Sequence, residues 1–185
     1  GYNGGSDWGS VAYDPARGIL VANWNVTPMY EHYIPRKQAD AQDLYSIDDP
    51  RYTPGKGGAE GPGAMEDTPY AISVSAFMVP GLKTLCNEPP YGMITAINLH
   101  DQKVIWQQPL GTARANGPLG LPTGLPIQIG TPNNGGPAIT AGGLVFVAAA
   151  TDNLLRAIDL KTGKVLWTSV LPGGGQATPM TYTVN

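Results

Sequence analysis

Two polar side chains stand where apolar, strand-like runs end, and they are the first candidates for a binding site. Asn23 follows the apolar run 19–22, and Asp152 follows the run 145–151. A carboxamide offers two N–H donors and an acceptor oxygen, whereas a carboxylate offers acceptors only, or negative charge to a cation. Short polar side chains also form turns at such places, so these residues alone leave both interpretations open.

Other reactive side chains form no recognisable constellation. His32 and His100 are far apart in unrelated loops, and Glu66 and Asp67 lie in a weakly patterned stretch where we expect them to be solvated. Cys86 is the single cysteine, which excludes an internal disulfide, and we expect it to be packed as a small apolar side chain. Metal-ligand spacings of Cys and His, a Gly-x-Ser-x-Gly motif and a phosphate loop are absent from the sequence.

The elements that must position Asn23 and Asp152 are indicated by an internal repeat. Residues 96–106 and 157–167 share Ala, Ile, Leu, Lys, Val and Trp at the same places, 61 residues apart. Each copy predicts a hairpin whose second strand ends in a tryptophan. Gly163 supplies the positive φ that a tight turn needs, and Gln102 at the equivalent place in the first copy predicts a weaker turn.

Two further strand-like runs precede each copy of the repeat, so each copy belongs to a four-stranded unit. We therefore expect an all-β chain that forms part of a β-propeller. One blade is predicted at 136–171. An earlier blade is predicted at 10–110, with an insertion at 27–90 that shows no sustained periodicity, and a further blade is expected to start at 179–185. About two blades plus one strand cannot close a ring, so the remaining blades are expected to come from the same longer chain or from other subunits.

Loop length is unequal at the two ends of these predicted strands. The turns at 14–18, 100–102, 141–143 and 161–163 are tight, whereas the connections at 25–92, 109–135 and 172–178 are long. In an up-and-down meander the long connections emerge on one face. We expect a ligand site there, because loops on one rim of a rigid scaffold commonly carry function.

Composition excludes several partners. The net charge is −3 with 14% charged residues, and Lys and Arg form no cluster, so neither nucleic acid nor an acidic membrane is an expected partner. No apolar run approaches the ~20 residues that cross a bilayer. The 25 glycines and 18 prolines favour short strands joined by turns over a helical bundle.

The sequence resembles the membrane-bound quinoproteins that oxidise glucose, quinate or shikimate with pyrroloquinoline quinone (PQQ). The resemblance covers essentially the whole chain, and the repeat is similar to the family's tryptophan-docking motif, in which each indole packs on the next blade. It is carried by Asp7-Trp8-Gly9, Thr68-Pro69-Tyr70, Cys86-Asn-Glu-Pro-Pro-Tyr-Gly92, Gly135-Gly136-Pro137, Thr151-Asp152 and Gly175-Gln-Ala-Thr-Pro-Met-Thr-Tyr182.

The resemblance implies an eight-bladed propeller of which this chain is a late portion. It also implies that Asn23 and Asp152 bind PQQ, and that a divalent cation, calcium or magnesium, assists hydride transfer to the quinone. The catalytic aspartate and the metal ligands of the family have no counterpart in this sequence. The chain alone is therefore expected to be inactive and to contribute no catalytic residue and no metal ligand.

Substrate and location are further implications of the resemblance. The loop around Asn23 and residues 33–40 is nearer the quinate/shikimate branch than the glucose branch, and Arg36 is expected to pair bidentately with a substrate carboxylate. Family members are held on the periplasmic face of the bacterial inner membrane by N-terminal helices that this chain lacks, and they pass electrons to ubiquinone. The alternative function is a non-catalytic propeller scaffold, which explains the repeats but not the one-sided loops.

Overall fold

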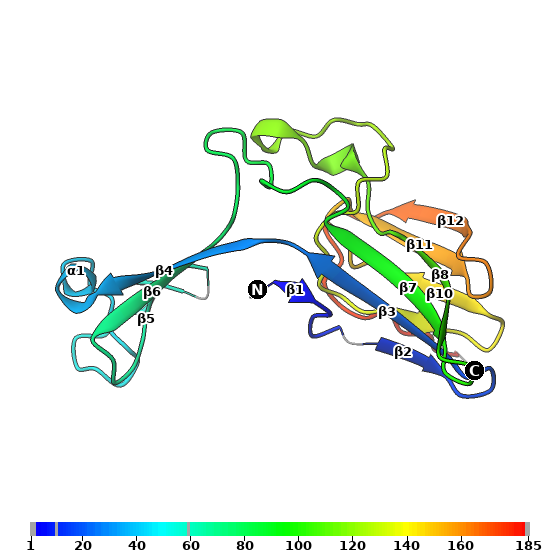
Figure 1. The fold of residues 1–185 in the computed structure, drawn as a ribbon, viewed down its shortest axis with the longest axis horizontal. Coiled ribbons are helices and arrows are strands. Elements are labelled where there is room, and N and C mark those ends of the chain that lie inside the picture. The colour runs from blue at the N-terminus through cyan, green and yellow to red at the C-terminus, as the bar shows by residue number, and fades with distance from the viewer. Residues whose placement is uncertain (1–2, 10, 59, 184–185) are drawn as a thin grey trace. The chain divides into compact units, whose positions relative to one another are not determined.

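The structure is a computed structural model that describes residues 3–9, 11–58 and 60–183 (Figure 1). The chain folds into two compact units, Gly1–Thr27 with Met78–Asn185, and Pro28–Phe77. Both units are built mainly of antiparallel strands, which confirms the all-β class.

The first sheet of the larger unit is formed by segments that flank the insertion. Strand β3 (Ile19–Val26) pairs with β7 (Gly92–Asn98), although 65 residues separate them along the chain. The outer neighbours complete the antiparallel order: β1 (Gly4–Gly5) and β2 (Val11–Asp14) both pair with β3, and β8 (Lys103–Pro109) pairs with β7.

The second sheet is a simple meander. Its order is β12-β11-β10-β9, formed by β9 (Ala138–Ile139), β10 (Leu144–Val147), β11 (Leu154–Asp159) and β12 (Val165–Val170). The two copies of the sequence repeat form β7–β8 and β11–β12. Each hairpin has a register shift at the same place of the repeat, Ala96/Ile97 and Ala157/Ile158, so the repeat extends to backbone irregularities.

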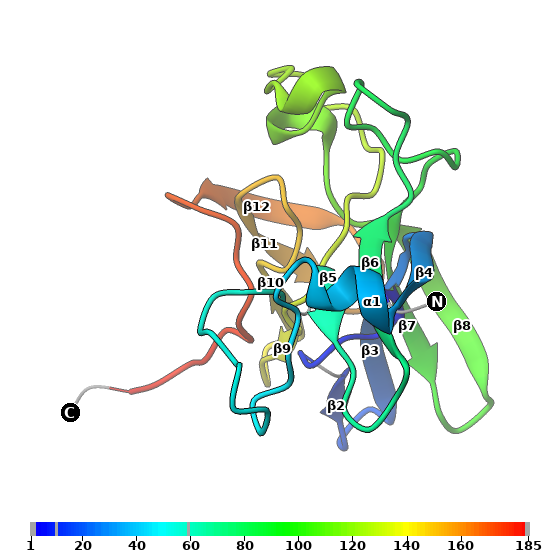
Figure 2. The same ribbon diagram turned by 90° about the vertical axis from the view of Figure 1, so that its left-hand side faces the viewer.

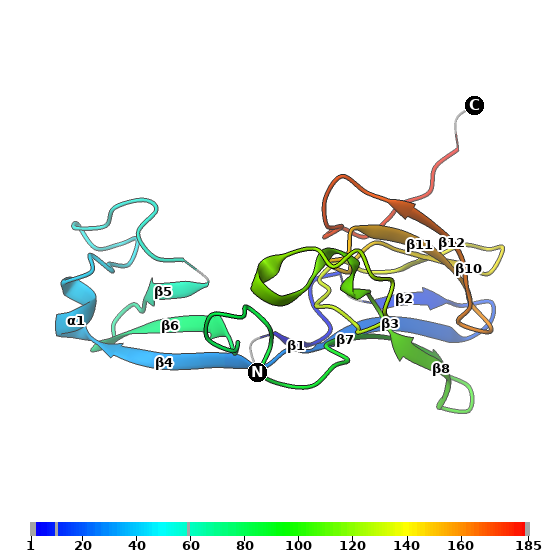
Figure 3. The ribbon, with the colours of Figure 1, turned by 90° about the horizontal axis from the view of Figure 1, so that it is seen from above.

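The two sheets share one hydrophobic core, and Figure 3 shows them as neighbouring layers. The core draws on the inner strands of both sheets, and its members include Val21, Ile94, Val145, Val147, Ile158 and Leu160. Burial of such side chains contributes roughly 1.5–3 kcal/mol each. Inner strands from two successive meanders packed in this way are the arrangement of adjacent propeller blades.

Trp106 docks on the neighbouring sheet, as the repeat predicts. Its indole Nε1 donates a hydrogen bond to the Leu160 carbonyl oxygen at 2.8 Å. The indole lies against Gly163, where an added Cβ would come within 2.7 Å of Trp106 Cδ2. A glycine suits position 163 for two reasons: its φ is positive, 74°, and the indole ring approaches its backbone too closely for a Cβ. Trp167, the equivalent residue of the second copy, is 50% exposed.

The sheets have a tight end and a long-loop end. At the tight end, Leu99 N donates to the Gly18 carbonyl and Leu160 N donates to the Gly143 carbonyl. At the other end the long connections bond to one another: Tyr91 N donates to the Gly130 carbonyl at 2.9 Å, and Leu110 N donates to the Gly92 carbonyl at 3.0 Å. The predicted placement of the long loops on one face is thus confirmed.

The long connection between the sheets contains two short 3₁₀ turns, Ala113–Ala115 and Pro118–Gly120, and otherwise no regular structure. Cys86, expected to be packed, is exposed instead because its segment runs over the surface. Residues 179–183 pair with no strand in the described parts of the chain, so the start of a further blade there stays a prediction.

The smaller unit, whose sequence shows no sustained periodicity, forms a three-stranded sheet. Its order is β4-β6-β5, with β4 (Met29–Pro35), β5 (Gly61–Ala64) and β6 (Tyr70–Ala76), and the short helix α1 (Arg36–Asp40) lies beside β4 and β6 (Figure 2). Ile34 is the one buried residue of β4. An exposed strand carries no apolar alternation, which is why the sequence pattern missed it.

Candidate functional site at the long-loop end

Strand β3 carries Asn23 to the long-loop end of the larger unit. Alternate residues of β3 are buried, so Ile19, Val21, Asn23 and Asn25 share the face that packs against the core. The face changes from apolar to polar towards the end of the strand. Asn23 is only 2% exposed, so its amide must find its partners inside the fold.

Both N–H groups of the Asn23 amide have partners. Nδ2 donates to Asn133 Oδ1 at 2.5 Å and to the Gly135 carbonyl oxygen at 2.8 Å. The amide oxygen is different, since Asn23 Oδ1 is buried and has no hydrogen-bond partner. A buried acceptor left unpaired costs roughly 1–3 kcal/mol, and a ligand that supplies a donor or a cation would recover this free energy.

Asn133 and Asn25 lock the connection between the sheets onto β3. The Asn25 side chain bonds the backbone of residue 133 twice: Nδ2 donates to the Asn133 carbonyl at 2.7 Å, and Oδ1 accepts from the Asn133 N–H at 2.9 Å. The Asn133 side chain in turn donates to the Trp24 and Thr131 carbonyls, both at 3.4 Å. Asn133 was not identified from the sequence, although the pair Asn133-Asn134 stands out in a connection rich in Gly and Pro.

Asp152 holds the beginning of the same connection, the segment that directly follows β8. Its carboxylate accepts from the N–H and the hydroxyl of Thr112 at 2.8 and 2.9 Å, and it forms a buried ion pair with Arg156. Burial alone would raise the pKa of Asp152, but the hydrogen bonds and charge of Arg156, together with Thr112, outweigh burial and lower this pKa below its ordinary value. Arg156 and Thr112 were not identified from the sequence.

The structure brings Asn23 and Asp152 to the same end of the packed sheets. Asn133, the partner of Asn23, forms a β-bridge with Ala150, two residues before Asp152. The two residues differ in what they offer: Asn23 has a free acceptor, whereas both oxygens of Asp152 are engaged inside the chain. A contact between Asp152 and a cofactor stays a prediction.

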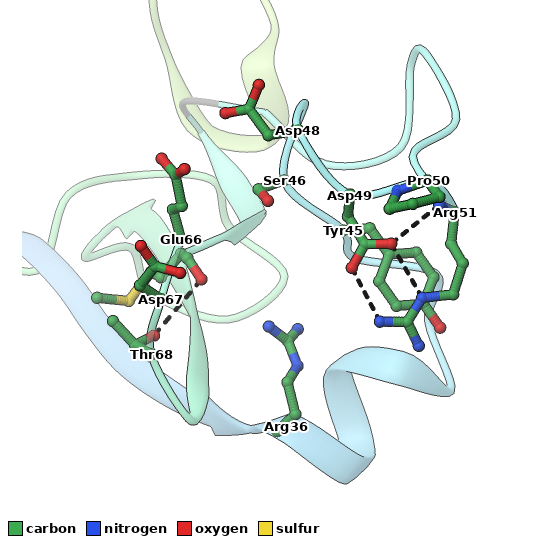
Figure 4. Close-up of a pocket in the computed structure, with 11 residues that line it drawn as sticks. Arg36, Tyr45, Ser46, Asp48, Asp49, Pro50, Arg51, Glu66, Asp67 and Thr68 are labelled. Atoms are coloured by element: carbon green, nitrogen blue, oxygen red, sulfur yellow. Dashed lines mark hydrogen bonds and ion pairs between the residues drawn. The ribbon is translucent and has the colours of Figure 1, made fainter.

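Arg36, the predicted substrate-binding residue, lies in the smaller unit and lines a hollow of about 420 Å³ there (Figure 4). Its guanidinium donates to the Leu44 carbonyl oxygen at 2.8 Å and pairs with Asp40 at 3.1 Å. Glu66 and Asp67 line the same hollow and are exposed, as expected from the sequence.

Four acidic side chains line this hollow together with Arg36 and Arg51. Asp48, Asp49, Glu66 and Asp67 all line it, and Asp49 is bound by Arg51, whose hydrogen bonds lower the pKa of Asp49 to about 2. Carboxylates on several sides disfavour an anionic substrate in this hollow. The pairing of Arg36 with a substrate carboxylate is untested and stays a prediction.

Two absences hold for the described residues 3–9, 11–58 and 60–183. In these ranges no three His, Cys, Asp or Glu side chains converge as a metal site. Likewise, none of the helices that the structure describes combines the length and hydropathy required of a membrane span.

Taken together, the packed meanders, the docked indole and the polar long-loop end define a sector of a β-propeller with a candidate ligand site at one end. The chain belongs to the family described as PQQ: glucose/ethanol/alcohol dehydrogenase, β-propeller domain, whose pattern matches residues 1–185. The resemblance seen in the sequence is thereby confirmed.

Individual relatives give further detail. Over its whole length the chain is 68% identical to the "Glycerol dehydrogenase large subunit" of Gluconobacter oxydans (strain 621H), and the match covers 25% of that protein. It is also 38% identical to the "Quinate/shikimate dehydrogenase (quinone)" of Acinetobacter baylyi, and this match covers 97% of the chain and 21% of that protein. The chain therefore spans about a quarter of the length of these relatives.

A solved structure shares the fold. The quinohemoprotein alcohol dehydrogenase from Comamonas testosteroni superposes with a TM-score of 0.53 at 21% identity, over 98% of this chain and 21% of that one. This likeness supports the propeller architecture.

Proposed function

We propose that this chain is a sector of a PQQ-dependent dehydrogenase that oxidises a small polyol of the glycerol class. The observation that carries the proposal is the 68% identity to a glycerol dehydrogenase large subunit, set against 38% for a quinate/shikimate dehydrogenase. This comparison does not support the preference for quinate or shikimate expected from the loop around Arg36. The acidic surroundings of Arg36 also favour an uncharged polyol over a carboxylate.

The long-loop end fits the cofactor in one definite respect. Asn23 Oδ1 is a buried acceptor without a partner, and PQQ carries an N–H on its pyrrole ring besides its carbonyl and carboxylate oxygens. When bound, PQQ would supply the quinone that accepts a hydride, which carries both electrons of the oxidation, from the alcohol carbon, and calcium or magnesium would polarise the quinone.

Residues of this chain have supporting roles in the proposal. Asn23 accepts a hydrogen bond from the bound cofactor or meets its cation, and Asn133 and Gly135 hold the Asn23 amide in place. Asp152 fixes the segment after β8 through Thr112. The catalytic base and the metal ligands, apart from Asn23 in the case that its oxygen meets the cation, are proposed to lie in other parts of the full-length polypeptide.

The electron acceptor and the location are also proposals. The Acinetobacter relative is named as a quinate/shikimate dehydrogenase (quinone), which supports electron transfer to a membrane quinone such as ubiquinone. A membrane quinone as acceptor is compatible with the periplasmic face of the inner membrane as the place of the reaction.

Steady-state kinetics of the full-length polypeptide would test the proposed substrate. The apoprotein is loaded with PQQ and Ca²⁺ or Mg²⁺, and dye reduction is measured with glycerol, quinate and glucose. We expect kcat/KM to be highest for glycerol. A higher kcat/KM for quinate would overturn the substrate proposal, and a protein that neither binds PQQ nor reduces dye would favour the scaffold alternative.

A further inference from the structure

Asn133 occupies a central place in the polar network at the long-loop end, although its side chain is only 1% exposed. Its orientation is fixed by backbone groups. Asn133 Nδ2 faces two carbonyl oxygens, those of Trp24 and Thr131, so Asn133 Oδ1 must point the other way, towards Asn23.

The orientation of Asn23 follows from that of Asn133. The two groups nearest to Asn23 Nδ2 are Asn133 Oδ1 and the Gly135 carbonyl oxygen, and both can only accept. A rotated Asn23 amide would bring its oxygen against two acceptor oxygens, which is unfavourable. Both N–H groups are therefore used, and Oδ1 alone is left for a ligand.

From this network we infer that Asn133 is a positioning residue that makes Asn23 an acceptor-only contact for the bound cofactor. The inference rests on the proposed function, since it assumes that PQQ binds at this end. The group opposite Asn23 Oδ1 is then electropositive: an N–H or O–H of the cofactor, or the divalent cation that accompanies it. A quinone or carboxylate oxygen at that place would be repelled.

The backbone clamp by Asn25 supports this interpretation. Asn25 holds the N–H and the carbonyl of residue 133, so the Asn133 side chain is not needed to attach its own backbone to β3. The side chain is free to serve the orientation of Asn23.

A double-mutant cycle on PQQ affinity tests the inference in the full-length apoprotein. The dissociation constant of PQQ is measured by equilibrium titration for wild type, Asn23→Ala, Asn133→Ala and the double variant. We expect each single substitution to weaken PQQ binding about tenfold, and the double variant to bind no more weakly than Asn23→Ala. If Asn133 had only a structural role, its effect would persist in the Asn23→Ala background, with about a hundredfold loss, and the inference would be overturned.

Controls separate the possible failures. Asn98→Ala, at the tight end of the same sheet, should leave PQQ affinity unchanged. Should Asn133→Ala fail to fold, Asn133→Ser replaces it in the cycle, because a serine hydroxyl is too short to reach Asn23. A wild-type protein that binds no PQQ would refute the proposed function itself, whereas a wild type that binds PQQ alongside an additive cycle refutes only the role of Asn133.

The cycle is repeated after chelation of divalent ions to identify the group that Asn23 meets. If that group is the cation, the effect of Asn23→Ala disappears on chelation. If it is a donor of the cofactor, the effect remains. Both outcomes agree with an acceptor-only Asn23, whereas tighter PQQ binding by Asn133→Ala would contradict it.

Discussion

The substitution Gly163→Ala tests the contact that joins the two sheets. Gly163 has φ of 74°, and Trp106 Cδ2 would lie 2.7 Å from the added methyl group. The methyl group would therefore strain the backbone and also displace the indole from its place on the β11–β12 turn.

The expected loss of stability is the sum of these effects. A left-handed conformation costs a residue with a Cβ about 1 kcal/mol. Displacing Trp106 removes its hydrogen bond to the Leu160 carbonyl, which is worth about 1 kcal/mol. If the ring also loses about 50 Å² of apolar contact, at about 25 cal/mol per Å², a further ~1 kcal/mol is lost. We expect a total near 3 kcal/mol.

The assay is urea unfolding of the full-length polypeptide, followed by circular dichroism. Gly124→Ala is the matched control, because Gly124 has nearly the same φ, 71°, and no atom within 4 Å of an added Cβ. This control should lose only the backbone contribution of about 1 kcal/mol.

The refutation comes from the same substitution in a Trp106→Ala background. Without the indole, Gly163→Ala should cost no more than Gly124→Ala, since nothing is left to displace. An equal loss from Gly163→Ala with and without Trp106 would show that the indole does not dock there in solution.

Three further predictions concern the turn of the first repeat, the buried ion pair and the hollow. Gln102 has φ of 57°, so Gln102→Gly should relieve strain and stabilise the protein by up to about 1 kcal/mol in urea unfolding; a clear loss of stability would contradict this. Asp152→Asn leaves Arg156 buried without its partner and should cost about 3–5 kcal/mol. Because the pKa of Asp152 is lowered in the folded state, its stabilisation is complete only about one pH unit above the ordinary Asp value of ~4 and is lost as pH falls further. Below about pH 5 wild type should therefore lose stability more steeply than Asp152→Asn; parallel pH profiles would exclude this ion pair as the cause. Arg36→Ala should leave glycerol kcat/KM unchanged, because glycerol has no carboxylate for Arg36, whereas a marked fall would place Arg36 in the glycerol site.

The propeller blades could be predicted from the sequence because their information is local and repeated. The twin hairpins carry the same residues in the same order, and the structure repeats even their register shift. Gln102 shows the limit of residue preferences, since it adopts the positive φ expected of glycine at the equivalent turn position.

The smaller unit could not be predicted because its strands bury few apolar residues: β4 buries only Ile34, and β6 buries Ala71 and Val74. Strand β4 is paired along its full length with β6, yet burial imposes no alternation on its sequence. Backbone pairing between distant segments leaves little trace in a sequence when side chains are solvated.

The candidate site was predicted in part. Asn23 and Asp152 were recognised as polar residues at strand exits, but the residues that define their roles come from distant segments. Asn133 lies 110 residues after Asn23, and Thr112 lies 40 residues before Asp152. Neither pairing follows from periodicity, because the connection that carries both Asn133 and Thr112 contains only two short 3₁₀ turns and no strand.

The most direct test of the whole account is a crystal structure of the full-length polypeptide with PQQ bound. We predict that the two sheets form adjacent blades, with Trp106 on Gly163. We also predict that the cofactor lies at the long-loop end, where either the cofactor or its accompanying cation contacts Asn23 Oδ1. PQQ bound at a site remote from Asn23, or sheets that do not pack as neighbouring blades, would contradict the account.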